Sequence, residues 1–143
     1  LKGLASFSED LGFLGRLLNQ DISERDAKAA REAFDAFKDL VNRFPESRYA
    51  EDARARMRFL VNAQAQAELN VAKFYYSRKA YLAAIQRSQT VVRDFQRTPA
   101  VEEALSLMAR SYEALQLKDL QSDAERVLAA NFPNSRYLQQ PKR

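Results

Sequence analysis

Cysteine and histidine are both absent from this chain of 143 residues. Their absence excludes disulfides, thiolate chemistry, imidazole bases and the usual Cys/His zinc sites. Glycine occurs only at positions 3, 12 and 15, so no glycine-rich phosphate loop can lie in the rest of the sequence. No run of ~18 apolar residues is present either, and we therefore expect no membrane-spanning helix.

The residues that are abundant favour helices. Ala, Leu, Arg, Gln and Glu dominate, and all are good helix formers. Prolines at positions 45, 99, 133 and 141 divide the chain into segments. A chain of this length forms one compact domain or one short repeat array. The composition predicts an all-α protein.

Positive charge is concentrated in the middle of the chain. The net charge is +4, and residues 51–100 carry nine basic and four acidic side chains, whereas the two flanking parts are nearly balanced. One interpretation is a set of solvated helix faces. The other is a basic patch that binds an acidic partner.

Apolar residues recur at helical spacing along most of the sequence. From Ala27 to Phe44 this spacing predicts an amphipathic helix that Pro45 ends. Ser47 is the expected N-cap of the next helix, which continues without a breaker to about Ser77.

Three further helices are predicted after this long one. The first covers residues 81–95, after a joint at 78–79. The second starts at Thr98 and Pro99, with the threonine as N-cap and the proline at the first helical position. The third covers residues 124–132, after a joint placed at 118–120.

One hexapeptide motif occurs twice. FPESRY at residues 44–49 recurs as FPNSRY at 132–137, and a degenerate copy, FQRTPA, lies at 95–100. Tyr75 and Tyr112, like Phe95 and Phe132, are 37 residues apart. Two helices and a proline-marked turn every ~34 residues are the tetratricopeptide pattern. Each hairpin must stack on a neighbour to bury its apolar face, so we expect the phenylalanine to pack under the next hairpin.

These spacings predict a tetratricopeptide-type helical hairpin solenoid with about three repeats. The expected parts are a repeat with a glycine-containing loop at 1–44, a repeat with an overlong first helix at 47–95, a last repeat at 98–132 and a tail at 133–143. Phe44 and Phe95 are 51 residues apart instead of 37, and the extra residues would add roughly 21 Å of helix. The glycine-containing loop either packs on its own repeat or contacts a partner.

Paired carboxylates are the strongest catalytic candidates. They occur at Glu51/Asp52, Glu102/Glu103 and Glu9/Asp10. A catalytic pair needs a pocket that desolvates one partner, whereas the first two pairs fall in helix first turns, where they stabilise the helix dipole. We therefore expect no catalytic, cofactor-binding or metal-binding residue, and no enzyme.

Aromatic and basic residues alternate in KFYYSRKAYLAAIQR, residues 73–87. Single-stranded nucleic acid is bound by such mixtures. Here, however, the aromatic residues fall at the helical spacing of the core residues, so we expect them to be packed inside. What remains for the surface is Arg78, Lys79 and Arg87. These three are the candidate partner-binding residues.

The chain resembles the BamD family, the tetratricopeptide lipoproteins of the outer-membrane β-barrel assembly (BAM) machinery. The resemblance is carried by FPESRYAEDA, by the overlong helix leading to VAKFYYSRKAYLAAIQR, and by VVRDF followed by EEALSLMARSYEAL. It covers almost the whole sequence. The displaced proline in DFQRTP departs from the family's turn.

The resemblance implies a non-enzymatic scaffold on the periplasmic face of the outer membrane. Its implied partners are the last POTRA domain of BamA, the lipoproteins BamC and BamE, and unfolded β-barrel substrates. Arg87 matches an arginine that meets the POTRA domain, and Arg78 lies at the turn beside it. The chain begins at Leu1 within LKGLASF, as if a helix had been cut, which suggests a fragment. Because the family carries its lipid on an N-terminal cysteine and this chain has none, the resemblance implies a C-terminal fragment without the lipid anchor and about two repeats.

Two alternative functions stay open from the sequence. One is a periplasmic tetratricopeptide coordinator of envelope constriction, whose repeats carry similar turns. The other is a basic helical-repeat binder of nucleic acid, whose affinity would fall steeply with salt.

Overall fold

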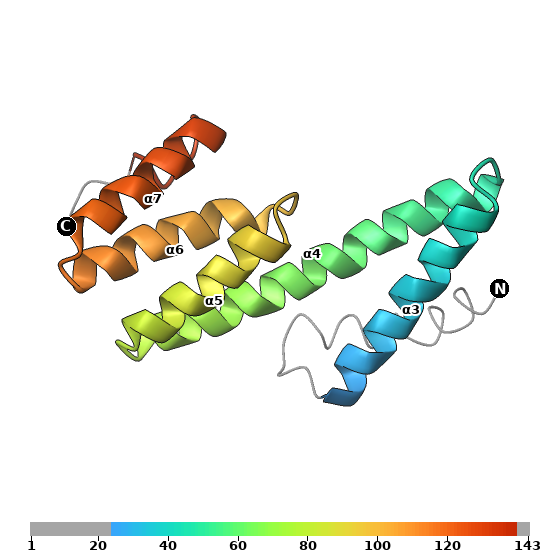
Figure 1. Ribbon diagram of the computed structural model, residues 1–143, viewed down its shortest axis with the longest axis horizontal. Coiled ribbons are helices and arrows are strands. Elements are labelled where there is room, and N and C mark those ends of the chain that lie inside the picture. Colours follow the sequence, from blue (N-terminus) through green and yellow to red (C-terminus); the bar gives the residue numbers. More distant parts are fainter. Residues whose placement is uncertain (1–23, 140–143) are drawn as a thin grey trace. The chain divides into compact units, whose positions relative to one another are not determined.

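The computed structural model describes residues 24–139 of the chain. Within this range the backbone forms helices α3 (Glu24–Arg43), α4 (Arg48–Ser77), α5 (Tyr81–Asp94), α6 (Ala100–Ala114) and α7 (Lys118–Asn131), shown in Figure 1. No strand occurs between residues 24 and 139, which confirms the all-α prediction. The predicted glycine-containing loop and the Glu9/Asp10 pair lie outside the described residues.

The chain divides into two compact units, residues 1–67 and residues 68–143. The first contains α3 and the first part of α4, and the second contains the end of α4 with α5, α6 and α7. Helix α4 is unbroken over 30 residues, whereas α5, α6 and α7 have 14, 15 and 14. The prediction of one overlong helix, here about 45 Å, is confirmed.

In the first unit, α3 and the start of α4 are joined by the turn of FPESRY. The Ser47 amide donates to the Phe44 carbonyl at 3.0 Å. The Ser47 hydroxyl accepts a hydrogen bond from the Tyr49 amide at 3.2 Å, which confirms Ser47 as the cap of α4. Phe37 is the largest fully buried side chain of this unit. Phe44 is 57% exposed, so the expectation that it packs under a neighbouring hairpin is wrong.

The same turn recurs after α7. The Ser135 amide donates to the Phe132 carbonyl at 2.9 Å, and the Tyr137 amide donates to the Ser135 hydroxyl at 3.2 Å. In both copies the arginine also donates to the hydroxyl of the following tyrosine, at 2.6 Å for Arg48 and 2.7 Å for Arg136. The repeated hexapeptide therefore encodes one repeated set of hydrogen bonds.

The degenerate copy before α6, FQRTPA, keeps the backbone bond and lacks both side-chain bonds, because Pro99 and Ala100 stand where the other copies have arginine and tyrosine. The Thr98 amide donates to the Phe95 carbonyl at 3.1 Å, as in the other turns. However, the Thr98 hydroxyl donates to the same carbonyl at 2.8 Å instead of accepting from the helix, so the predicted side-chain cap is wrong. Pro99 follows Thr98 here, and the hydroxyl of the buried Thr98 forms its hydrogen bond with the preceding turn instead of with α6.

Two other turns share a second geometry. Lys79 and Gln116 have φ values of 61° and 59°, in the left-handed region. The amide that follows each of them bonds back to a tyrosine carbonyl, Ala80 to Tyr75 and Leu117 to Tyr112, both at 2.9 Å. These are Schellman turns, 37 residues apart like the repeats.

This geometry corrects one predicted joint. Helix α7 begins at Lys118, so the joint placed at 118–120 lies inside the helix, and the helix predicted from 124 starts six residues earlier. The turn was missed because Gln116 adopts a conformation that usually signals glycine. The other joint, at 78–79, is confirmed.

The core of the second unit lies between its helices. Helix α6 contacts both α5 and α7. Ile85, Ala109, Tyr112 and Ala124 form a buried cluster, with Met108 packed against it. Phe95 and Phe132, which end α5 and α7, are half-buried. This packing fixes α5, which carries the candidate binding residue Arg87.

Candidate partner-binding surface

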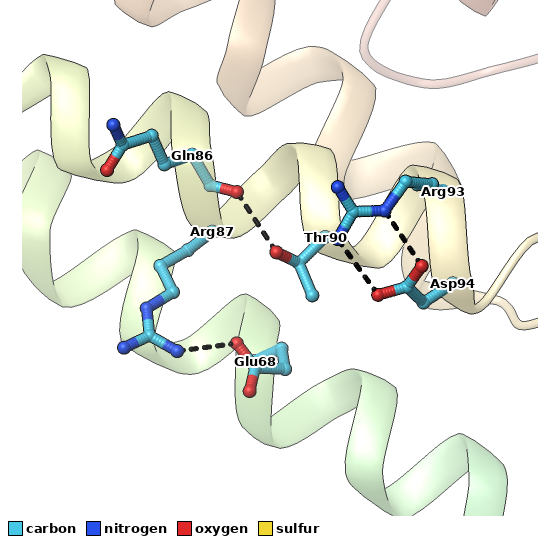
Figure 2. Close-up of polar contacts among 6 residues, drawn as sticks. All are labelled: Glu68, Gln86, Arg87, Thr90, Arg93 and Asp94. Atoms are coloured by element: carbon cyan, nitrogen blue, oxygen red, sulfur yellow. Dashed lines mark hydrogen bonds and ion pairs between the residues drawn. The ribbon is translucent and has the colours of Figure 1, made fainter.

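Arg87 lies on α5 and faces the end of α4. Its Nη1 atom is 3.1 Å from Oε2 of Glu68, as Figure 2 shows. The side chains are 46% and 28% exposed, so water reaches both charges. An exposed pair of this kind contributes about 0–1 kcal/mol to stability. The ion pair therefore orients Arg87, and the arginine can exchange Glu68 for another carboxylate at little cost.

Sequence reasoning missed Glu68, although the sequence contains a signal for it. Glu68 is the single acidic residue between Asp52 and Asp94. It lies about as far before the turn at 78–79 as Arg87 lies after it. In an antiparallel helical hairpin, residues equally distant from the turn face each other.

This ion pair has no counterpart in the last hairpin. The equivalent positions, 37 residues further on, hold Leu105 and Ala124. Both are buried, at 3% and 6% exposure. A position that packs the core in one hairpin thus carries a half-exposed charged pair in the other. Of the two hairpins in the second unit, the one formed by α4 and α5 carries the pair.

Arg78 and Lys79 lie together at the turn between α4 and α5. Both are exposed, and Lys79 is the residue with positive φ. The Arg78 guanidinium lies 5.2 Å from the centre of the Phe74 ring. Phe74 and Leu82, on either side of this turn, are 54% and 65% exposed. Arg87 lies farther along α5, about 9 Å from its start at Tyr81.

Intramolecular pairing divides the basic residues of the second unit into two groups. Lys73 pairs with Glu103 at 2.8 Å. Arg93 pairs with Asp94 at 2.9 Å, as Figure 2 shows. The hydrogen bond from Arg93 holds the pKa of Asp94 below its ordinary value. Between residues 68 and 100, cations without an ion pair to any described residue are Arg78, Lys79 and Arg97.

The described carboxylate pairs lie near the starts of α4 and α6. Glu102 and Glu103 lie in the first turn of α6, as predicted. Of the other pair, Glu51 lies in the first turn of α4, whereas Asp52 lies beyond it and pairs with Arg56 at 2.8 Å. No group of three or more His, Cys, Asp or Glu residues that could hold a metal ion occurs in the described part of the chain. None of its helices is long and apolar enough to cross a membrane.

The stacked hairpins, the recurring turns and the surface cations together define a helical-repeat protein of the tetratricopeptide type. The chain belongs to the YfiO family, whose model is described as an outer membrane lipoprotein and matches residues 1–128. This membership agrees with the resemblance found in the sequence and decides against the envelope-constriction coordinator.

Curated relatives are named outer membrane protein assembly factor BamD. The protein of Neisseria meningitidis serogroup B is 48% identical over the whole of this chain and 54% of its own length. That of Xylella fastidiosa Temecula1 is 34% identical over 99% of this chain and 48% of its own length. That of Vibrio cholerae is 35% identical over 92% and 54%. This chain spans about half the length of these relatives, whose names describe an assembly factor and not an enzyme.

Proposed function

We propose that this chain is a non-enzymatic protein–protein scaffold in the assembly of outer-membrane β-barrel proteins, and that it docks the last POTRA domain of BamA. The family membership and the names of the relatives support the assembly role. The site of action is the periplasmic face of the outer membrane. BamC, BamE and unfolded β-barrel substrates are further partners of the same assembly.

The charge arrangement at the α4–α5 hairpin carries the docking proposal. Arg78 and Lys79 are exposed cations with no acidic partner among residues 24–139. Arg87 is held by a single half-exposed carboxylate. Exchanging that carboxylate for one on a partner costs about 1 kcal/mol or less, because the existing pair is solvated. An acidic surface on the POTRA domain would be recognised by all three cations.

Calorimetric titration with the isolated last POTRA domain of the cognate BamA tests this proposal. We expect wild-type chain to bind with a dissociation constant in the low micromolar range or below. Arg87→Glu should abolish binding while the helical circular dichroism signal stays unchanged. Arg126→Glu is the control, because Arg126 is an exposed arginine on α7 whose ion pair within the described part of the chain is with its neighbour Asp123.

The outcomes separate specific docking from general charge attraction. Equal weakening by Arg87→Glu and Arg126→Glu would reject a defined site, because both variants change the net charge by the same amount. The nucleic-acid alternative predicts that equal weakening, with a steep loss of affinity in salt. Arg78→Glu and Lys79→Glu should weaken docking less than Arg87→Glu if the turn lies at the rim of the interface.

A further inference from the structure

A small cleft lies in the second unit, and Arg87, Arg78 and Lys79 are not among its lining residues. Its volume is about 150 Å³, and it is formed by the end of α4, by α6 and by the turn that follows α7. One water occupies about 30 Å³ of liquid, so the cleft has room for about five waters or for one side chain of similar size. Its lining residues are Lys73, Tyr76, Glu103, Ser106, Leu107, Arg110 and Tyr137.

Arg110 offers the cleft a guanidinium with free donors. Its Cζ atom lies 4.7 Å from the centre of the Tyr76 ring. Stacking of this kind uses the flat face of the guanidinium and leaves the N–H groups at its edge free. No ion pair joins Arg110 to another residue in the described range. A planar fork of N–H groups without an acid suits a carboxylate, which it can bind through two hydrogen bonds.

Ser106 supplies a second donor from the wall of the cleft. The residue is 8% exposed, and its hydroxyl makes no hydrogen bond to another residue in the described range, but its oxygen stays accessible to water from the cleft. The Ser106 hydroxyl is thus available to a molecule inside the cleft.

The remaining walls set the charge and the polarity of the site. Lys73 and Glu103 neutralise each other at 2.8 Å, so the excess positive charge in the cleft is that of Arg110. Leu107 is 5% exposed, and Tyr76 and Tyr137 are half-buried, so much of the wall is apolar or aromatic. A free inorganic anion would find little complement in these walls. A carboxylate attached to an extended peptide would bind Arg110 and Ser106 while its apolar neighbours contact the tyrosines.

From this arrangement we infer that the cleft between α4, α6 and the final turn is a binding site for a carboxylate of an extended peptide. The carboxylate is a glutamate or aspartate side chain or the end of a chain, since both present the same two oxygens. This site shares no residue with the proposed BamA-docking surface. Its test requires neither BamA nor the docking variants, so the two proposals can fail separately.

Fluorescence anisotropy with the full 143-residue chain provides the test. Three octapeptides, each carrying a neutral boron-dipyrromethene dye on its N-terminal amine, serve as probes. One has Ser-Gly-Ser-Tyr-Glu-Tyr-Ser-Gly with an amidated end, the second has glutamine in place of glutamate and a free terminal carboxylate, and the third has glutamine and an amidated end. We expect at least one carboxylate probe to bind tenfold or more tightly than the uncharged third probe.

Variants of the lining residues assign the effect to the cleft. Arg110→Gln should remove the preference for carboxylate, and Arg110→Lys, which keeps the charge but not the planar fork, should restore only part of it. Ser106→Ala should weaken the carboxylate probe severalfold. Arg126→Gln, which removes an equal charge from the exposed face of α7, should change nothing.

The source of the carboxylate follows from the same data. Tighter binding of the first probe than the second identifies an internal acidic side chain, and the reverse identifies a chain terminus. Equal binding of all three probes would overturn the inference, and so would equal weakening by Arg110→Gln and Arg126→Gln.

Discussion

The pair of Arg87 and Glu68 allows docking and folding to be separated by single substitutions. Arg87→Gln removes the arginine and leaves Glu68 in place, whereas Glu68→Gln leaves the arginine and removes its intramolecular partner. Both substitutions delete the same 3.1 Å contact. A purely structural arginine would therefore make the two variants equivalent in every assay.

The expected loss of stability is small for both variants. Two unit charges 4 Å apart attract by about 1 kcal/mol in water and about 4 kcal/mol at an effective dielectric constant of 20. With exposures of 46% and 28%, this pair lies toward the aqueous limit. We expect each variant to lower the free energy of unfolding by about 0.5–1 kcal/mol. For a chain of this size the midpoint of thermal unfolding would fall by about 1–4 °C.

The effects on docking should differ. Removing an arginine that is desolvated against a partner carboxylate costs about 2–5 kcal/mol, which is roughly a 30-fold to several-thousand-fold loss of affinity for Arg87→Gln. Glu68→Gln frees the arginine from its competitor, so affinity should stay unchanged or rise by up to about fivefold, equivalent to 1 kcal/mol.

Calorimetry with the POTRA domain and thermal unfolding by circular dichroism measure the two quantities on the same samples. Equal losses of affinity in the two variants would refute the reasoning, because Arg87 would then act only by holding the hairpin together. Unchanged affinity in Arg87→Gln would refute it as well.

Three further predictions concern stability. Gln116→Gly should raise the free energy of unfolding by about 0.5–1 kcal/mol, because glycine adopts the left-handed conformation at φ 59° without a steric penalty. Gln86→Gly, in the middle of α5, should lower the free energy of unfolding by about as much, and urea unfolding measures both variants. Ser47→Ala should cost about 1 kcal/mol by removing the cap of α4, and Ser47→Asp should restore most of it in the same assay; a loss that aspartate does not recover would argue against the cap. Leu69→Ala should cost about 2–5 kcal/mol because Leu69 is fully buried, whereas Leu82→Ala, at a side chain 65% exposed, should change thermal stability by less than about 0.5 kcal/mol; similar losses in both would contradict the packing described here.

The sequence was sufficient to predict most of the helices and the class of fold. Apolar spacing and the prolines placed α3, α4, α5 and the start of α6 within a few residues of their ends. These features are local, because a helix is determined by its own periodicity and by the residues that end it. The overlong α4 followed from the same spacing, since nothing between Arg48 and Ser77 interrupts it.

The errors occurred where a residue behaved against its usual preference. Gln116 adopts a glycine-like conformation, which moved the start of α7 to Lys118. The Thr98 hydroxyl donates to the Phe95 carbonyl instead of capping α6. The 37-residue period would have corrected the first error, because it carries the joint at 78–79 onto 115–116. The second depends on burial, which a local pattern does not contain.

The binding residues were only partly accessible from the sequence. Arg78, Lys79 and Arg87 were selected because they fall outside the apolar spacing that marks the core face of each helix. Their pairing states depend on side chains that are distant in sequence, such as Glu68 for Arg87. The cleft that contains Arg110 and Ser106 combines residues from three segments. No spacing rule along one helix could have brought these together.

The recurring turns make the last hairpin a transferable module. Residues 101–137 begin after a phenylalanine–threonine turn and end within a phenylalanine–serine turn, and both are closed by the same backbone hydrogen bond. A duplicate of this 37-residue segment inserted after Tyr137 would therefore meet matching backbone geometry at both junctions. Leu117, Leu120 and Val127 are exposed on α7, whereas the positions 37 residues earlier, Ala80, Ala83 and Thr90, are half-buried. The array could be lengthened by whole hairpins, and each added copy would cover the apolar surface left open by the one before it.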